Sequence, residues 1–217
     1  MNPVFAAAVL GGLGLIVGGV VAVVSTRLRD DDHRAAPRWR DPLIVFCCGL
    51  LGVWAGICGQ MWLMTAATAI LGWQLLLIAV VDGENLWLPD ILTWPLIATG
   101  LGVAAVMDWS VAVSHLLGAA IGFVGLWALG RLYHLIRKRD GLGGGDPFLF
   151  AGAGAWVGGM GLPSVLLWAC TVSLSLVFGI LMIRRTVSGS ERLPFGVFLA
   201  VGIWLTWLYG PLVSNVP

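Results

Sequence analysis

Charged residues are scarce in this sequence. Asp, Glu, Lys and Arg make up 11% of its 217 residues, against about 25% in soluble domains. Apolar residues make up 59%, and runs of the roughly 20 apolar residues needed to cross a bilayer recur along almost the whole length. This composition excludes a water-soluble globular protein. It predicts an all-α, polytopic integral membrane protein that forms a single transmembrane domain over residues 1–217.

Residue types that build metal sites and common hydrolytic centres are few and scattered. The four cysteines lie in apolar stretches and form no CxxC pair, so neither a disulfide framework nor a zinc site is predicted. The three histidines are isolated, and no serine lies in a GxSxG turn. The net charge of +1 gives no reason to expect nucleic acid as a partner. We therefore expect no metal, no cofactor and no nucleic acid.

The hydrophobic stretches predict about eight transmembrane helices. Their approximate limits are 4–25, 42–59, 61–81, 89–107, 111–133, 147–161, 164–184 and 194–212. The first stretch exceeds the roughly 7 to 15 apolar residues of a signal-peptide core, so we expect a retained anchor. Gly14 and Gly18, like Gly118 and Gly122, have the GxxxG spacing, which predicts close contact between helices.

The basic residues all fall in alternate links between these stretches. They are Arg27, Arg29, Arg34, Arg38, Arg40, Arg131, Arg137, Lys138, Arg139, Arg184, Arg185 and Arg192. The positive-inside rule places those links in the cytoplasm. Asp30, Asp31, Asp32 and Asp41 interleave with the arginines of the first link, which indicates a solvated, charge-balanced loop.

Two other acids stand at the ends of apolar segments on this same predicted side. Asp82 follows the uncharged span from Met61 to Val81, and an ionisable group at such a depth is a functional candidate. Asp146 opens another span, after a turn that includes Gly143, Gly144 and Gly145. Glycine permits close backbone approach, so an extended peptide could lie against this turn.

The predicted topology permits these two carboxyl groups to meet. Carboxylates within hydrogen-bond reach do not both ionise easily, so one keeps a proton. Such a pair can activate water as a base and protonate a departing amine as an acid. Nothing else in the sequence offers peptide chemistry, so Asp82 and Asp146 are the candidates for it.

At these residues the chain resembles the type IV prepilin leader peptidases, membrane aspartic proteases with a GxGD motif. The matching segments are VVDGENLWLPDILTWPL from Val80, GLGGGDPFLFAGAGAWVG from Gly141 and LPFGVFLAVGIW from Leu193, with a weaker match, GLIVGGVVAVVSTRL, from Gly14.

The resemblance implies that Asp82 and Asp146 are the catalytic pair and that Glu84 and Asp90 are neighbours. It also implies cleavage after a glycine in prepilins or pseudopilins of a type IV pilus, type II secretion or competence system. The short basic leader would be removed at the cytoplasmic face of the bacterial inner membrane.

The chain departs from the family pattern at two places. Many members carry Lys two positions after the motif aspartate, where this chain has Phe148. Longer members hold a cysteine-tetrad domain in the first cytoplasmic link and N-methylate the new amino terminus. Here that link, about Arg27 to Asp41, has no cysteine and is too short for such a domain. We therefore predict a peptidase and do not extend methyltransferase activity to this chain.

Two alternatives remain open from the residues alone. A small ion-coupled transporter would use glycine-broken helices and intramembrane acids to bind cations or protons. A non-catalytic assembly scaffold would keep the fold of the peptidases without their chemistry. Acid-dependent ion flux without cleavage favours the first, and assembly that survives loss of both aspartates favours the second.

Overall fold

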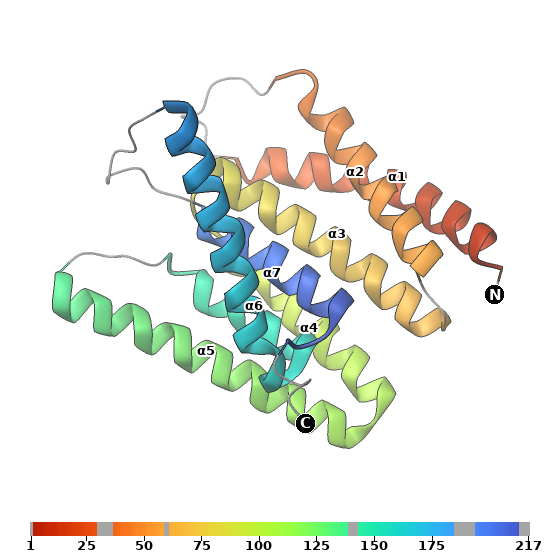
Figure 1. The fold of residues 1–217 in the computed structure, drawn as a ribbon. Helices are drawn as coiled ribbons and strands as arrows, with labels where there is room; N and C mark the ends of the chain where they lie inside the picture. Colours follow the sequence, from red (N-terminus) through yellow and green to blue (C-terminus); the bar gives the residue numbers. More distant parts are fainter. Residues whose placement is uncertain (1, 30–36, 59–60, 139–142, 185–193, 213–217) are drawn as a thin grey trace. The chain divides into compact units, whose positions relative to one another are not determined.

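The computed structural model describes residues 2–29, 37–58, 61–138, 143–184 and 194–212, and this part of the chain forms seven helices (Figure 1). They are α1 (Pro3–Arg27), α2 (Arg40–Cys58), α3 (Trp62–Asn85), α4 (Asp90–Met107), α5 (Trp109–Arg137), α6 (Asp146–Arg184) and α7 (Phe195–Tyr209). The predicted all-α class is confirmed. The helices form two compact units, Met1–Asn85 with α1 to α3 and Leu86–Pro217 with α4 to α7.

Six of these helices are long and apolar enough to cross a membrane, and α7 is a shorter apolar helix. Large apolar side chains are widely exposed, among them Val4, Ile16 and Leu135. Exposed apolar surface on this scale is unfavourable in water and suits contact with lipid. The polytopic membrane protein expected from composition is therefore confirmed, with a helix count that differs from the expected eight because two predicted spans fall within α6.

The first unit contains a close contact between α1 and α2, made possible by small side chains. The buried face of α1 includes Gly11, Gly14 and Gly18, spaced at three and four residues. A Cβ atom on Gly14 would lie 2.9 Å from the carbonyl carbon of Cys48, and one on Gly18 would lie 2.6 Å from the Cα of Val45. The two backbones are therefore in direct contact, and the prediction of glycine-mediated packing is confirmed here.

Helix α3 adds a regular apolar stripe to this unit. The residues that pack against the core formed with α1 and α2 are Ala69, Trp73, Leu76, Leu77 and Val80. They recur at intervals of three and four, so they lie on one helical face. The indole N–H of Trp73 donates to the carbonyl oxygen of Cys48 over 2.9 Å. This buried hydrogen bond holds α3 against α2.

The second unit is organised around α6. A Cβ on Gly118 of α5 would lie 2.5 Å from the backbone nitrogen of Gly159, and one on Gly122 would lie 2.6 Å from the carbonyl oxygen of Phe150. Both glycines of this second GxxxG pair therefore serve close packing, as predicted. Trp156, only 1% exposed, donates its indole N–H to the carbonyl oxygen of Leu96 in α4 over 2.9 Å.

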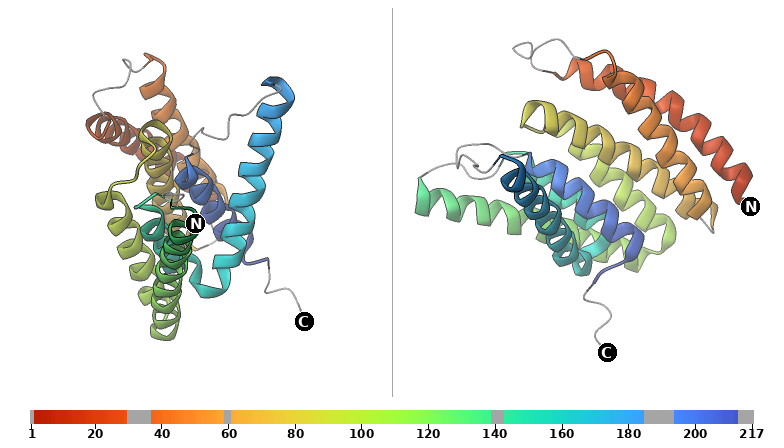
Figure 2. Two further views of the ribbon diagram at one scale, coloured as in Figure 1. Left: turned by 90° about the vertical axis from the view of Figure 1, so that its left-hand side faces the viewer. Right: turned by 45° about the horizontal axis from the view of Figure 1, so that its top comes forward.

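Helix α6 is broken at Gly158, whose φ of 67° and ψ of 174° are far from helical. Its 39 residues would extend roughly 58 Å in one straight helix at ~1.5 Å per residue, about twice the hydrocarbon thickness of a bilayer. The ribbon changes direction between the two halves of α6 (Figures 1 and 2). The two halves correspond to the predicted segments 147–161 and 164–184.

A histidine side chain satisfies the backbone at this break. In an unbroken helix the carbonyl oxygen of Ala155 accepts from the N–H of Gly159, four residues later. Here the Nδ1 atom of His115 in α5 lies 2.9 Å from that oxygen. Because a carbonyl oxygen only accepts, Nδ1 carries the proton in this hydrogen bond. His115 thus supplies a hydrogen bond to the backbone at the break. This bond is important because lipid cannot form hydrogen bonds with an exposed carbonyl group.

Substitution of Gly158 tests this break directly. The conformation of Gly158 is one that only glycine adopts readily, so we expect Gly158→Ala to lower the free energy of unfolding by about 1–3 kcal/mol. Gly159→Ala is the matched control, because a Cβ there would meet nothing closer than the Cα of Gly118 at 3.6 Å, an ordinary contact. Thermal unfolding in detergent measures both variants. Equal melting temperatures for the two would contradict the assignment of strain to Gly158.

Candidate active site

Asp82 lies in the last turn of α3, and its side chain is buried with 4% of its surface exposed. The helix ends at Asn85, and Leu86 follows with a φ of 56°. A left-handed residue directly after a helix is a common way of ending it. The carboxyl group is therefore carried by a rigid helix end, directly before a sharp change in the course of the chain.

An arginine from α2 anchors this end of α3. The Nε and Nη2 atoms of Arg40 donate to the two carboxylate oxygens of Glu84 over 2.5 and 2.8 Å. This is the bidentate arrangement that gives guanidinium–carboxylate pairs their geometric specificity. Arg40 is only 5% exposed, although its place among the charges of the first link indicated a solvated position. The sequence pattern gave no signal for its pairing with a residue 44 positions away.

Asp146 begins α6 in the second unit and is also buried, with 4% of its surface exposed. Its Oδ2 atom accepts a hydrogen bond from the backbone N–H of Gly143 over 2.9 Å. The backbone N–H of Asp146 donates in return to the carbonyl oxygen of Gly143 over 3.2 Å. The two bonds close a compact turn, which holds the carboxyl group at the start of the helix.

The three glycines before Asp146 have different surroundings. A Cβ on Gly145 would lie 2.5 Å from the carbonyl oxygen of Leu88, so this glycine is required by packing within the second unit. A Cβ on Gly143 would lie 3.0 Å from Oδ2 of Asp146, whereas one on Gly144 would meet nothing within 4 Å. Gly144 is thus the glycine whose Cα faces open space, and the predicted contact of all three with substrate stays a prediction.

Leu88 links this turn to the start of α4. It precedes Pro89 and Asp90, where α4 begins, and its side chain is buried. The start of α4 and the start of α6 therefore lie together at one end of the second unit. Asp90 itself is exposed, in keeping with its expected role as a neighbour rather than a catalyst.

Phe148 follows Asp146 by two residues in α6, at the position where many family members are expected to carry lysine. Its ring centroid is 4.9 Å from that of Phe123 in α5 and 6.3 Å from that of Trp94 in α4. The three rings form an aromatic cluster beside the helix that begins with Asp146, at separations typical of favourable aromatic pairs. A charged lysine at this position would be surrounded by apolar rings. The phenylalanine found here therefore suits the aromatic side chains around it.

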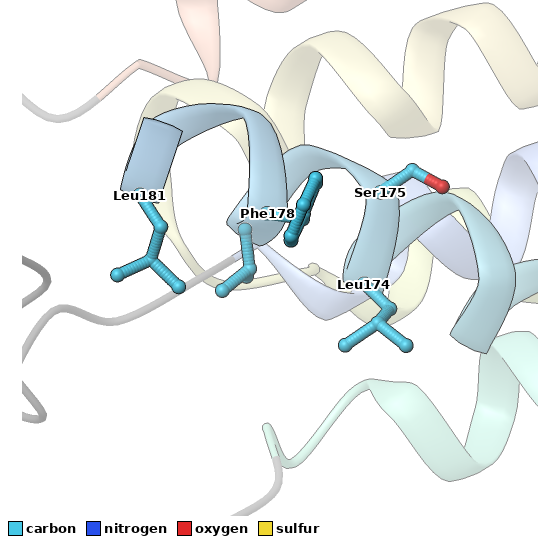
Figure 3. A pocket seen from close by; sticks show the side chains of 5 residues that line it. Leu174, Ser175, Phe178 and Leu181 are labelled. Atoms are coloured by element: carbon cyan, nitrogen blue, oxygen red, sulfur yellow. The ribbon is translucent and has the colours of Figure 1, made fainter. Parts of the chain in front are cut away.

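A separate hollow of about 370 Å³ lies along the second half of α6, lined by Leu174, Ser175, Val177, Phe178 and Leu181 (Figure 3). None of these lining residues carries a group that titrates near neutral pH. The hollow is therefore no candidate for the chemistry. In the described part of the chain, no group of three or more His, Cys, Asp or Glu residues is placed to hold a metal ion.

Residues 69–180 match the model of the type IV leader peptidase family. The chain belongs to this family. The matched range includes both candidate aspartates and the glycine turn, whereas Arg40 lies outside it.

Similar proteins from several bacteria carry one name, prepilin leader peptidase/N-methyltransferase. The protein of Stutzerimonas stutzeri is 34% identical over 176 residues, which cover 81% of this chain and 60% of that protein. That of Pseudomonas aeruginosa is 33% identical over 189 residues, or 84% of this chain and 62% of that protein. This family member thus spans about three fifths of the length of these relatives. No solved structure gives a significant match.

The two aspartates belong to different units, Asp82 to the first and Asp146 to the second. Their pairing is accordingly a prediction from the sequence. The two acids have similar surroundings in their own units. Each carboxyl group is buried, each stands at a helix terminus, and each terminus is fixed by specific hydrogen bonds from its own unit.

Proposed function

We propose that this leader peptidase family member is a membrane aspartic endopeptidase that removes the short basic leader of prepilins or pseudopilins. The observation that carries the proposal is the match of the region around Asp82 and Asp146 to the peptidase family. The names of the similar proteins support the substrate class. We further propose that the two units together form a single transmembrane peptidase domain over residues 1–217, in the bacterial inner membrane.

The cytoplasmic placement of the reaction is supported separately by each unit. In the first, Arg40 bonds to Ser25 near the end of α1 and to Glu84 near the end of α3, so Asp82 lies at the end that carries Arg27 and Arg29. In the second, α5 ends at Arg137 and Lys138 follows, close in sequence to the turn before Asp146. Each acid is thus associated with basic residues, which face the cytoplasm by the positive-inside rule.

The proposed mechanism uses the two carboxyl groups as a coupled pair. One is ionised and takes a proton from the attacking water, while the other keeps its proton and delivers it to the departing amine. Water adds to the scissile carbonyl carbon, and the bond from that carbon to the amide nitrogen breaks. The pair titrates as a unit, so the roles of base and acid are properties of the pair. We expect this reaction to need neither metal nor cofactor.

The substrate is proposed to place its cleavage site against the turn formed by Gly143, Gly144 and Gly145. Its apolar helix stays in the bilayer, and its basic leader stays in the cytoplasm. The open space beside Gly144 supports an approach by an extended peptide at this residue. Gly145 has a second role, because its close contact with Leu88 packs the turn against the start of α4.

Substitutions at these neighbouring glycines separate substrate binding from packing. We expect Gly144→Val to raise KM about 10-fold while leaving thermal stability unchanged, because its side chain enters open space that the substrate would use. We expect Gly145→Val to lower the free energy of unfolding by about 1–3 kcal/mol, because its side chain meets the backbone of Leu88. Cleavage kinetics and thermal unfolding measure the two effects. A Gly144→Val enzyme with unchanged KM would remove the proposed substrate contact.

The decisive experiment is incubation of the purified protein in liposomes with a full-length pseudopilin, followed by mass spectrometry. We expect one cut after a glycine, and a new amino terminus without an added methyl group. Ion flux that depends on the aspartates, with no cleavage, would instead establish a transporter. Pilus or secretion assembly restored by a variant that lacks both aspartates would establish a scaffold.

A further inference from the structure

Arg40 forms a buried polar junction at one end of the first unit. Besides its two bonds to Glu84, its Nη1 atom donates to Thr26 Oγ1 over 3.0 Å and to Asp41 Oδ1 over 2.8 Å. Its Nη2 atom also donates to Ser25 Oγ over 2.9 Å. A guanidinium group has five N–H donors, and these contacts use all of them. The junction therefore joins the end of α1, the beginning of α2 and the end of α3.

The junction acts on the helix that carries Asp82. Glu84 and Asp82 are two residues apart, so they project from α3 in directions that differ by roughly 200°. Glu84 continues the stripe of Ala69, Trp73 and Val80 that packs against α1 and α2. Asp82 therefore lies on the opposite face. Fixing Glu84 fixes the rotation of the last turn of α3, and with it the direction in which the Asp82 carboxyl group points.

A second buried stripe supports this geometry. Leu71, Leu75 and Ile78 are each no more than 4% exposed, and they precede Asp82 at intervals of four, three and four residues. They share one face of α3 with it. A rotation of the helix end would move the carboxyl group off this face, and interactions between buried groups depend steeply on such displacements.

We propose that Arg40 is a positioning residue for Asp82, acting through Glu84 and the hydroxyl groups of Ser25 and Thr26. Arg40 orients the catalytic carboxyl group without touching the substrate. The inference rests on the proposed peptidase function for its effect on rate. The hydrogen bonds that hold the end of α3 all lie within the first unit.

The kinetic test compares Arg40→Ala and Arg40→Lys with the wild-type enzyme on a pseudopilin substrate. We expect kcat to fall about 10²-fold in Arg40→Ala, the size of effect that a displacement of about 1 Å produces, while KM stays within about 2-fold. Arg40→Lys keeps the charge but has three donors on a single nitrogen, so it restores only part of kcat. Added guanidinium ion is expected to raise the kcat of Arg40→Ala.

Trp73→Phe is the matched control for loss of stability. It removes a buried hydrogen bond between α3 and α2 at a site distant along the helix from Asp82. We expect it to lower the melting temperature with kcat unchanged. If Arg40→Ala and Trp73→Phe lower kcat in the same proportion to their loss of stability, and guanidinium rescues neither, Arg40 has a general structural role and the proposal is overturned.

A labelling test is independent of peptidase activity. It uses Asp82→Cys in a background where the native cysteines are replaced by alanine, and it measures the rate of reaction with a soluble maleimide. We expect the buried position to react slowly with Arg40 present, and at least about 10-fold faster with Arg40→Ala, because the released turn exposes its side chain. Gly83→Cys, which replaces an exposed residue, is expected to react equally in both backgrounds.

The two tests separate failure of this inference from failure of the proposed function. An unchanged labelling rate at position 82 would overturn the positioning role even in an active enzyme. A wild-type protein that fails to cleave, combined with an Arg40-dependent labelling rate, would overturn the peptidase proposal and retain the orienting junction.

Discussion

Asp82→Asn and Asp146→Asn are each expected to lower the rate of leader removal by about 10³-fold or more, because general acid–base catalysis contributes about 10² to 10⁴ and each cleavage needs both the base and the acid. Asparagine keeps the shape of the side chain but neither accepts nor releases a proton at neutral pH. The substrate would still bind, so KM should change little. Single-turnover cleavage of a pseudopilin, followed by mass spectrometry, measures the loss.

The double variant sharpens this test. Residues that act as one catalytic unit are strongly non-additive, so removing both carboxyl groups should cost little more than removing one. If the two carboxyl groups acted independently, the rate losses of the single variants would multiply in the double variant. Two single variants with modest losses that multiply in the double variant would contradict a shared proton and point to separate roles in binding.

Asp108 provides a matched control on the link between α4 and α5. Its Oδ1 atom accepts hydrogen bonds from the backbone N–H and the hydroxyl group of Ser110, at 2.7 and 2.6 Å. These bonds hold the pKa of the Asp108 carboxyl group below its ordinary value, so it is ionised at neutral pH. Asn caps helices as well as Asp does. We therefore expect Asp108→Asn to leave cleavage and folding unchanged, which isolates the effect of the other two acids.

The sequence predicted the helices and the glycine-mediated contacts, because both depend on residues that are close together in the chain. Apolar runs located the helices because the bilayer selects length and hydrophobicity directly. The glycine pairs indicated close helix contacts because only glycine permits backbones to touch, and Gly14 and Gly118 do lie against neighbouring helices. Both features are local, and a local pattern is sufficient to show them.

Features that depend on distant partners were not visible in the sequence. Arg40 was grouped with the solvated charges of a link, and only the fold shows Glu84 beside it. The break in α6 was expected near Leu162 and Pro163, but it occurs at Gly158. Pro163 lies inside the helix, five residues beyond Gly158, so proline does not mark where this chain turns. Recognition of His115 as the partner of that break also required the packed structure.

The contact between α1 and α2 should be the most sensitive packing site of the first unit. We expect Gly14→Leu to lower the free energy of unfolding by about 3 kcal/mol or more, because overpacking commonly costs about 1–3 kcal/mol and here the obstacle is backbone. A Cβ at this position would already lie 2.9 Å from the carbonyl carbon of Cys48. A loss of this size corresponds to a melting temperature lower by about 6–12 °C.

Gly12→Leu is the control on the same helix, because a Cβ on Gly12 would meet nothing within 4 Å. Its side chain would add apolar surface on an exposed face, where substitutions usually change stability by less than about 0.5 kcal/mol. Both variants are compared by thermal unfolding in the same detergent. Equal losses would show that general helix properties, rather than contact with α2, set the requirement for glycine.

The same pair of variants connects packing with the proposed chemistry. Ser25 and Thr26 lie on α1, and both accept hydrogen bonds from Arg40. Displacement of α1 by Gly14→Leu should therefore loosen the junction at Arg40, and it should lower kcat below the value that the folded fraction alone explains. Gly12→Leu should leave kcat unchanged. If Gly14→Leu molecules that remain folded cleave at the wild-type rate, α1 contributes to stability alone and the junction does not depend on its position.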